Sequence, residues 1–316
     1  MSTTMVRTTP TRSASPTPPP PRTRRSVLPY TLLLPALLAL CAGLGYPLVR
    51  QVVLSLQGYG LAQQFGRPAE WVGLDNYAEI LGDRYLWLLV LRSVVFCLVC
   101  AATTMVIGTL LALAMRLMSK PVRLLVQTGL LLAWAMPVLA ALTVWQWLFD
   151  SQYGVVNWLL ARGGLDYEGH SWLIEPLSFF FVAAVVVVWM SVPFVAFTVY
   201  AGLIQLPAEI IEAAEVDGAG PVQRLRHVIL PLTRPILLIV GLLQVIWDLR
   251  VFTQIYVLQN AGGVTRETNL LGTYIYRSGI GEGNFGVASA VAVFMLALTV
   301  VLTWPYVAKM VKDVDA

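Results

Sequence analysis

The sequence predicts an all-α polytopic membrane protein with six transmembrane helices, and three observations carry this prediction. Of its 316 residues, 58% are hydrophobic and 12% are charged, with a mean hydropathy of +0.73. Soluble domains usually contain about twice that share of charged residues. Six apolar stretches reach the roughly 20 residues that a helix needs to cross a bilayer. Basic residues gather in alternate connections between these stretches, as in oriented membrane proteins.

Each expected span is a run of Leu, Val, Ala and aromatic residues with few charges. Their approximate bounds are Val27–Leu56, Tyr85–Met115, Val122–Phe149, Leu177–Leu203, Ile236–Leu258 and Phe285–Ala308. Together they define a transmembrane domain over residues 27–310. Within the second span, we expect Arg92 to snorkel or to pair inside the protein.

The distribution of Lys and Arg predicts that both termini are cytoplasmic. Basic residues precede the first span, follow the sixth, and occupy the connections after the second and fourth. They are Arg7, Arg12, Arg22, Arg24, Arg25, Arg116, Lys120, Arg123, Arg224, Arg226, Arg234, Lys309 and Lys312. The opposite connections hold five arginines and most of the acids. By the positive-inside rule, the chain is a multi-pass protein of the cell membrane.

The two ends of the chain are expected to be cytoplasmic tails. Residues 1–26 are rich in Thr, Pro, Ser and Arg and lack apolar periodicity, so we expect disorder. A signal peptide is the alternative, but the first apolar run is too long for one, which favours a retained anchor. Residues 311–316 form the short C-terminal tail. Arginines at the cytoplasmic face account for the pI near 9.0 without a nucleic acid partner.

Motifs for catalysis are absent or out of context, so we expect no enzymatic activity of this chain alone. No lysine follows Gly and precedes Ser or Thr as in a phosphate-binding loop. Residues 281–286 match G-x-G-x-x-G, but they lead into a span and follow no expected strand. His170 and His227 are expected on opposite sides of the membrane, so they form no zinc site. Cys97 and Cys100 lie within a span, where small packing residues are the favoured interpretation.

The connection after the fourth span, residues 204–235, has the signals of a helix, a turn and a second helix. A first helix is expected over Pro207–Asp217, with Gly218 as a left-handed C-cap. Pro221 is suited to begin a second short helix. We expect Pro231 and Pro235 to interrupt that helix before the fifth span. Such a hairpin is either a docking site for another protein or a solvated loop. The sequence pattern alone favours neither alternative.

Five stretches of the sequence resemble a known family. Residues 212–219 (EAAEVDGA) and 228–235 (VILPLTRP) are similar to the EAA loop of permease subunits in ATP-binding-cassette importers. Residues 71–77 (WVGLDNY), 45–48 (GYPL) and 252–258 (FTQIYVL) resemble the maltose-type, sugar-importing branch. Leu225 departs from the family, which usually has an aromatic residue there.

The resemblance implies a type I importer permease fold and a set of partners. A cytoplasmic pair of ATPase subunits would receive the coupling helix, a second permease would complete the pathway, and an external solute-binding protein would deliver the sugar. No cofactor or metal is implied. The residues expected to couple to the ATPase are Glu212, Ala213, Ala214, Asp217, Gly218, Leu225, Leu230 and Pro231.

Polar and aromatic residues at membrane depth are candidates for the substrate pathway, because such groups are costly there. The candidates are Gln244, Trp247, Asp248, Gln254 and Trp189. The alternative is that they join helices to one another, an interpretation that we favour for Arg250. Trp145 and Trp147 are expected in an interfacial aromatic belt.

Two other functions remain open at this point. A secondary transporter or channel would also have six spans, but it would not need a docking hairpin. An intramembrane enzyme would need a reactive group within the spans, where Asp248 is the carboxylate found. The motifs do not distinguish monosaccharides, oligosaccharides and glycerol phosphate as solutes.

Overall fold

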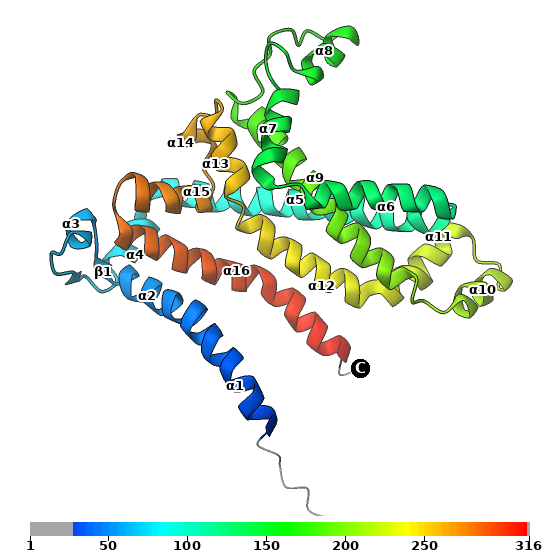
Figure 1. Cartoon of the computed structure of the whole chain (residues 1–316), viewed down its shortest axis with the longest axis horizontal. Helices are drawn as coiled ribbons and strands as arrows, with labels where there is room; N and C mark the ends of the chain where they lie inside the picture. Colours follow the sequence, from blue (N-terminus) through cyan, green and yellow to red (C-terminus); the bar gives the residue numbers. More distant parts are fainter. Residues whose placement is uncertain (1–27, 315–316) are drawn as a thin grey trace, which may run out of the picture. The chain divides into compact units, whose positions relative to one another are not determined.

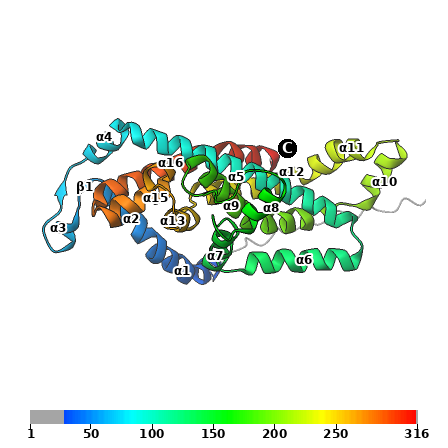
Figure 2. The same cartoon turned by 90° about the horizontal axis from the view of Figure 1, so that it is seen from above.

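The computed structural model describes residues 28–314, which are almost entirely helical (Figures 1 and 2). The expected tail over residues 1–26 lies outside the described residues. The chain divides into two compact units, Met1–Leu48 and Val49–Ala316. In the first unit, α1 (Leu28–Leu40) continues through a π-helical segment (Cys41–Gly45) into α2 (Tyr46–Ser55), which extends into the second unit.

Five helices among the described residues are long and apolar enough to cross a membrane. They are Thr31–Ser55, Arg84–Leu117, Pro176–Leu203, Pro221–Asn260 and Phe285–Met310. The first of these falls within the span expected over Val27–Leu56. α5 (Arg84–Leu117), α9 (Pro176–Leu203) and α16 (Phe285–Val314) confirm the second, fourth and sixth expected spans. α16 also takes in four of the residues that were expected in the C-terminal tail.

The third expected span, Val122–Phe149, consists of two helices with a break between them, and this pair makes a sixth span if both helices cross the membrane as one. α6 (Lys120–Ala135) and α7 (Val138–Leu148) meet at an angle of 102°. Pro137 lacks a backbone N–H and disfavours the helical conformation of the residue before it. Met136 accordingly takes extended angles, φ −67° and ψ 129°, and the helix stops.

The fifth expected span, Ile236–Leu258, is also divided. α12 (Leu230–Leu249) ends at Arg250, and α13 (Thr253–Asn260) begins after Phe252. At its other end, α12 follows without a loop from α11 (Pro221–Arg224) and a π-helical segment (Leu225–Ile229). The expectation that two prolines interrupt this region is wrong, because the π-helical segment leads into Pro231 without a break and Pro235 lies inside α12.

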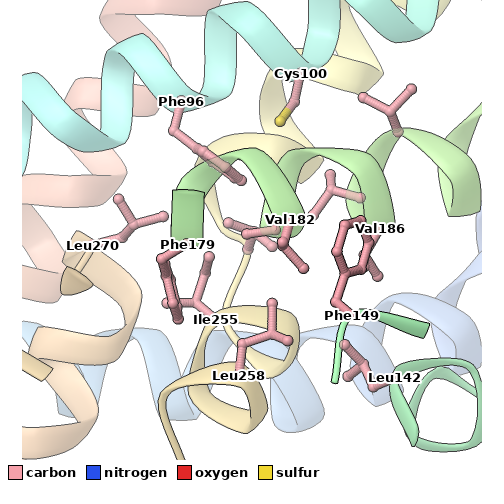
Figure 3. Close-up of a cluster of buried hydrophobic side chains, with 14 of the residues drawn as sticks. Phe96, Cys100, Leu142, Phe149, Phe179, Val182, Val186, Ile255, Leu258 and Leu270 are labelled. Atoms are coloured by element: carbon pink, nitrogen blue, oxygen red, sulfur yellow. The ribbon is translucent and has the colours of Figure 1, made fainter. Parts of the chain in front are cut away.

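The second unit is built around the contact between α5 and α9. At the crossing, an added Cβ on Gly108 would lie 2.6 Å from Cγ1 of Val195, so only glycine permits this approach. Figure 3 shows α9 packed between α5 and the α7 and α13 helices. Phe96 and Cys100 contribute from α5, and Ile255 contributes from α13. A second cluster joins α5 to α12 and α16.

Short elements connect the long helices. The two strands, β1 (Gln57–Gly58) and β2 (Glu70–Trp71), pair antiparallel, with Gln57 opposite Trp71. The short helices are α3 (Leu61–Gln64), α4 (Asp75–Gly82), α8 (Val155–Arg162), α10 (Ala208–Val216), α14 (Thr265–Thr268), α15 (Leu271–Tyr276) and a π-helical segment (Arg277–Gly281). The segment 281–286 follows this π-helical segment and no strand, so it is no dinucleotide motif.

The cysteines of the second span are packing residues, as expected. Cys97 and Cys100 are fully buried in α5. The Cys97 thiol donates to the carbonyl oxygen of Val245 on α12 at 3.4 Å. This contact fixes α5 against α12 at the level of the polar residues of α12.

Candidate functional site

The hairpin between the fourth and fifth spans begins with α10, which has no buried residue. The helix starts after Pro207, its N-cap, and ends at Asp217, within one residue of each predicted bound. Gly218 has φ +80°, the left-handed conformation expected of its C-cap. The amides of Gly218 and Ala219 donate to the last carbonyls of the helix, at 3.1 and 2.9 Å. The local sequence therefore sets both ends of this helix.

The exposed surface of α10 combines acids with apolar side chains. Glu212, Ala213 and Asp217 are exposed, and Ala214 is half-buried. Val216, at the end of the helix, is 88% exposed. Exposed apolar side chains on a short helix at the end of a bundle are typical of a surface that binds another protein.

A salt bridge holds the two arms of the hairpin together. Arg224 Nη1 in α11 lies 2.9 Å from Glu215 Oε1 in α10. Between the arms, a cavity of about 370 Å³ is lined by Asp217, Gly218 and residues of the second arm. Figure 1 shows α10 and α11 together at one end of the second unit. The two arms of the hairpin are thus held in a defined arrangement, which favours a docking site over a solvated loop.

The second arm runs into a long unbroken helix. The amide of Leu230 donates to the carbonyl oxygen of Leu225, the five-residue spacing of a π-helix. Leu225 and Leu230 are half-buried, and Pro231 is exposed. Helical backbone therefore continues from Pro221 to Leu249, from the hairpin to the candidate pathway residues.

The structure separates the candidate pathway residues into two groups. Gln244 and Asp248 are 0% and 3% exposed. The Gln244 side-chain amide donates to the Asp248 carboxylate at 3.3 and 3.4 Å, and the Gln244 carbonyl oxygen has no partner among the described residues. Residues four apart share one face of a helix, and this face is closed by packing. Both side chains are therefore enclosed by the rest of this chain.

The second group lies on accessible surface. Trp247 is 46% exposed, and its ring contacts Phe194 of α9 edge-to-face at 4.9 Å. The Gln254 side-chain amide donates to the sulfur of Met190 at 3.8 Å. Trp189 is half-buried and contacts Trp145 edge-to-face at 5.7 Å. Aromatic faces beside an amide are a suitable lining for a solute pathway.

Sequence reasoning missed or misplaced some neighbours of this group. Phe194 and Met190 are ordinary apolar residues of α9, and only their contacts place them beside the candidate residues Trp247 and Gln254. Trp145 was expected in an interfacial belt, but it stacks on Phe149 and packs against the core cluster. Trp147 is 56% exposed, which is compatible with a belt position.

The two arginines at membrane depth differ. Arg92 donates from Nη1 to the carbonyl oxygen of Arg266 at 3.3 Å, a pairing within the protein as expected. Arg250 is exposed at the end of α12 and forms no ion pair with a described residue, so its expected role as a helix-joining cation is wrong. Among residues 28–314, no cluster of three His, Cys, Asp or Glu side chains is placed to hold a metal.

The fold and this hairpin define a polytopic helical transport protein. Residues 104–308 match the family described as the inner membrane component of binding-protein-dependent transport systems. This match covers more than half of the chain, and the chain belongs to that family.

Named relatives agree with this assignment. The diacetylchitobiose uptake system permease protein DasB of Streptomyces coelicolor is 42% identical over 91% of this chain and 88% of its own. The trehalose/maltose transport system permease protein MalF of Thermococcus litoralis is 30% identical over 92% of this chain and 96% of its own. The resemblance to importer permeases is thereby confirmed.

A solved structure shares the fold. A chain of a bacterial ABC transporter involved in the import of the acidic polysaccharide alginate superposes with a TM-score of 0.73. The superposition covers 92% of this chain and 96% of that one, at 23% sequence identity. The fold expected from the sequence is confirmed.

Proposed function

We propose that this chain is the permease subunit of an ATP-driven importer for a mono- to oligosaccharide, with ATP hydrolysed on separate subunits. The observation that carries this proposal is the 42% identity to a diacetylchitobiose uptake permease across nearly the whole chain. The trehalose/maltose relative supports the same class of solute. The family membership supports delivery of the solute by an external binding protein.

In this proposal, both termini and the hairpin 204–235 are cytoplasmic. The basic residues of the hairpin, Arg224, Arg226 and Arg234, support this orientation. α10 then seats in a cleft of one ATPase subunit through Glu212, Ala213, Ala214, Asp217 and Gly218, supported by Leu225, Leu230 and Pro231 of the second arm. The exposure of its apolar and acidic side chains fits such a docking helix.

Movement of the ATPase reaches the pathway through continuous helix. From Pro221 to Trp247 the backbone is helical throughout, a length of about 40 Å. A shift of the hairpin is therefore transmitted to Trp247 without an intervening loop. A second permease subunit completes the cavity, and the two bundles open alternately to each side.

The solute contacts the accessible group of pathway residues. Trp247 and Trp189 offer aromatic faces, and Gln254 offers an amide that can exchange its weak contact with Met190 sulfur for a sugar hydroxyl. The buried pair Gln244 and Asp248 holds α12 in place within the bundle.

The test is ATP-driven uptake of radiolabelled saccharides by vesicles that contain the full importer. Gly218→Val should reduce uptake at least tenfold while the subunit still inserts, because a β-branched residue is strained at φ +80° and displaces the cap of α10. Gly164→Val is the matched control, since Gly164 has φ +87° and equally open surroundings outside the hairpin. Its uptake should stay near that of the wild type.

Two results would contradict the proposal. Undiminished uptake by the Gly218→Val importer would remove the hairpin from the coupling step. Uptake driven by an ion gradient in vesicles that lack the ATPase would instead favour a secondary transporter.

A further inference from the structure

A cavity of about 800 Å³ lies between the first halves of α5 and α9, away from the hairpin and from Trp247. Its walls are apolar. Leu91, Val95 and Val99 line it from α5, and Phe180, Phe181 and Ala184 line it from α9. All six belong to helices that are long and apolar enough to cross the membrane.

The cavity is open at the surface of these two long apolar helices. Leu91, Val95, Val99 and Phe181 are each between 51% and 60% exposed. An apolar recess at membrane depth that faces outward holds hydrocarbon, because water finds no hydrogen-bond partner there. Lipid tails are as apolar as these walls, so burial of a tail gives no preference for one lipid over another. Any preference must come from the polar end of the cavity.

The polar end carries one cation and one anion. Arg92 lies on α5, eight residues after the start of the helix at Arg84, and Glu175 lies just before α9. Both line the cavity. Arg92 uses one guanidinium nitrogen for the carbonyl oxygen of Arg266, which leaves other donors of its five for a ligand. Glu175 is exposed and forms no ion pair with a described residue.

Aromatic rings line the cavity together with these two charged residues. Tyr167 stacks on Trp172 with ring centroids 5.4 Å apart, and His170 contacts Trp172 edge-to-face at 4.9 Å. All three line the cavity. Tyr and Trp gather at the level of lipid headgroups, where one end of the ring is apolar and the other is wet. The cavity therefore runs from headgroup level into the hydrocarbon.

We propose that this cavity binds one phospholipid whose headgroup carries a primary ammonium, as in phosphatidylethanolamine. Arg92 contacts the phosphate, Glu175 accepts a hydrogen bond from the ammonium, and an acyl chain lies along the α5 and α9 walls. A quaternary ammonium, as in phosphatidylcholine, has no N–H to donate to Glu175. An anionic headgroup without an amine, as in phosphatidylglycerol, places no cation beside that carboxylate.

The test is native mass spectrometry of the complete purified importer after delipidation and addition of one defined phospholipid at a time. For the wild type, we expect phosphatidylethanolamine to bind about tenfold more tightly than phosphatidylcholine, the value of one charge-assisted hydrogen bond. Glu175→Gln should abolish this ratio, whereas Glu168→Gln, a nearby exposed carboxylate outside this cavity, should keep it. Arg92→Gln should weaken both lipids about equally.

A second pair of variants tests the acyl-chain groove. Val99→Trp fills the cavity and should remove lipid binding, and Leu98→Trp, on the neighbouring exposed position outside it, should not. Equal binding of phosphatidylethanolamine and phosphatidylcholine to the wild type would overturn the proposal. So would cross-linking of Val99→Cys to a partner subunit, which would show that a protein helix occupies the groove. None of these results depends on which solute is transported.

Discussion

The side-chain amide of Asn76 donates hydrogen bonds to the carbonyl oxygens of Ser55, at 2.9 Å, and Gln57, at 3.0 Å. Ser55 ends α2, and its hydroxyl donates to the carbonyl oxygen of Val52 at 2.7 Å. The hydroxyl of Tyr77 lies 2.7 Å from the hydroxyl oxygen of Ser55. Since the Ser55 proton is already used, Tyr77 is the donor. The Asn-Tyr pair of the 71–77 motif thus caps the end of α2.

We expect Asn76→Ala to destabilise the second unit by about 2 kcal/mol, because two buried carbonyls lose their donor. The thermal unfolding midpoint of the importer in detergent measures this loss. Asn260→Ala, at an exposed helix end, is the control and should leave the midpoint unchanged. Equal midpoints for both variants would show that Asn76 does not hold the end of α2.

Gly108 sets the distance between α5 and α9. A Cβ there would meet the Val195 side chain at 2.6 Å and the Ala196 backbone nitrogen at 3.2 Å. Gly108→Ala should therefore cost about 1–3 kcal/mol of stability through overpacking. Gly129→Ala in α6 has nothing within 4 Å and should be neutral or slightly stabilising. Chemical unfolding of both variants decides this, and a neutral Gly108→Ala would mean that the helices can separate freely.

The two groups of pathway residues should respond differently to substitution. Trp247→Ala should raise the KM for the transported saccharide several-fold with little change in the amount of folded importer, because Trp247 is accessible. Gln244→Leu should lower the amount of folded importer and leave the KM of the remainder unchanged, because it strands the buried carboxylate of Asp248. Saccharide uptake and size-exclusion yield measure the two effects. The reverse pattern would exchange the roles of the two faces of α12.

The turn after α7 depends on the charge of Asp150. Backbone hydrogen bonds from Tyr153 and Gln152, both at 2.8 Å, lower the pKa of this carboxyl group. At a pH above the ordinary pKa of about 3.8, the charged Asp150 side chain stabilises the folded turn. This contribution disappears as the pH falls through the lowered pKa of the folded state.

Asp150→Asn at pH 7 should therefore speed proteolysis at this turn. Chymotrypsin cleavage after Tyr153, which is 78% exposed, is the measurement. Asp166→Asn should leave the rate unchanged. With an acid protease at a pH below the lowered pKa of Asp150, wild type and Asp150→Asn should be cut equally fast. A difference that persists in acid would assign the effect to the amide itself and not to the lost charge.

Continuous apolar runs were sufficient to predict α5, α9 and α16 within a few residues. The bend between α6 and α7 had a signal in Pro137 that the hydropathy of the run concealed. The break between Leu249 and Thr253 had none, since no Gly or Pro lies there. Conversely, Pro231 and Pro235 predicted an interruption that the preceding π-helical segment avoids.

For the site, the ends of the short helix α10 could be predicted from the sequence. Which side chains of α12 are buried could not. Pro207, Asp217 and Gly218 marked the ends of α10 to within one residue, because capping depends only on neighbours in the chain. Gln244, Trp247 and Asp248 are close in sequence on α12, yet Gln244 and Asp248 are buried and Trp247 is 46% exposed. Which face of α12 packs against α5 depends on the tertiary fold, and the sequence of α12 alone does not predict it.

The π-helical turn at Leu225–Ile229 holds one residue more than an α-helical turn would at the same height. Were that surplus residue released, α11 would swivel by about 100° around the axis of α12, one residue's worth of helical rotation. α11 would then rotate relative to α12 while every residue between them stayed helical. A rotation of this kind would reorient α11, and with it α10, relative to α12.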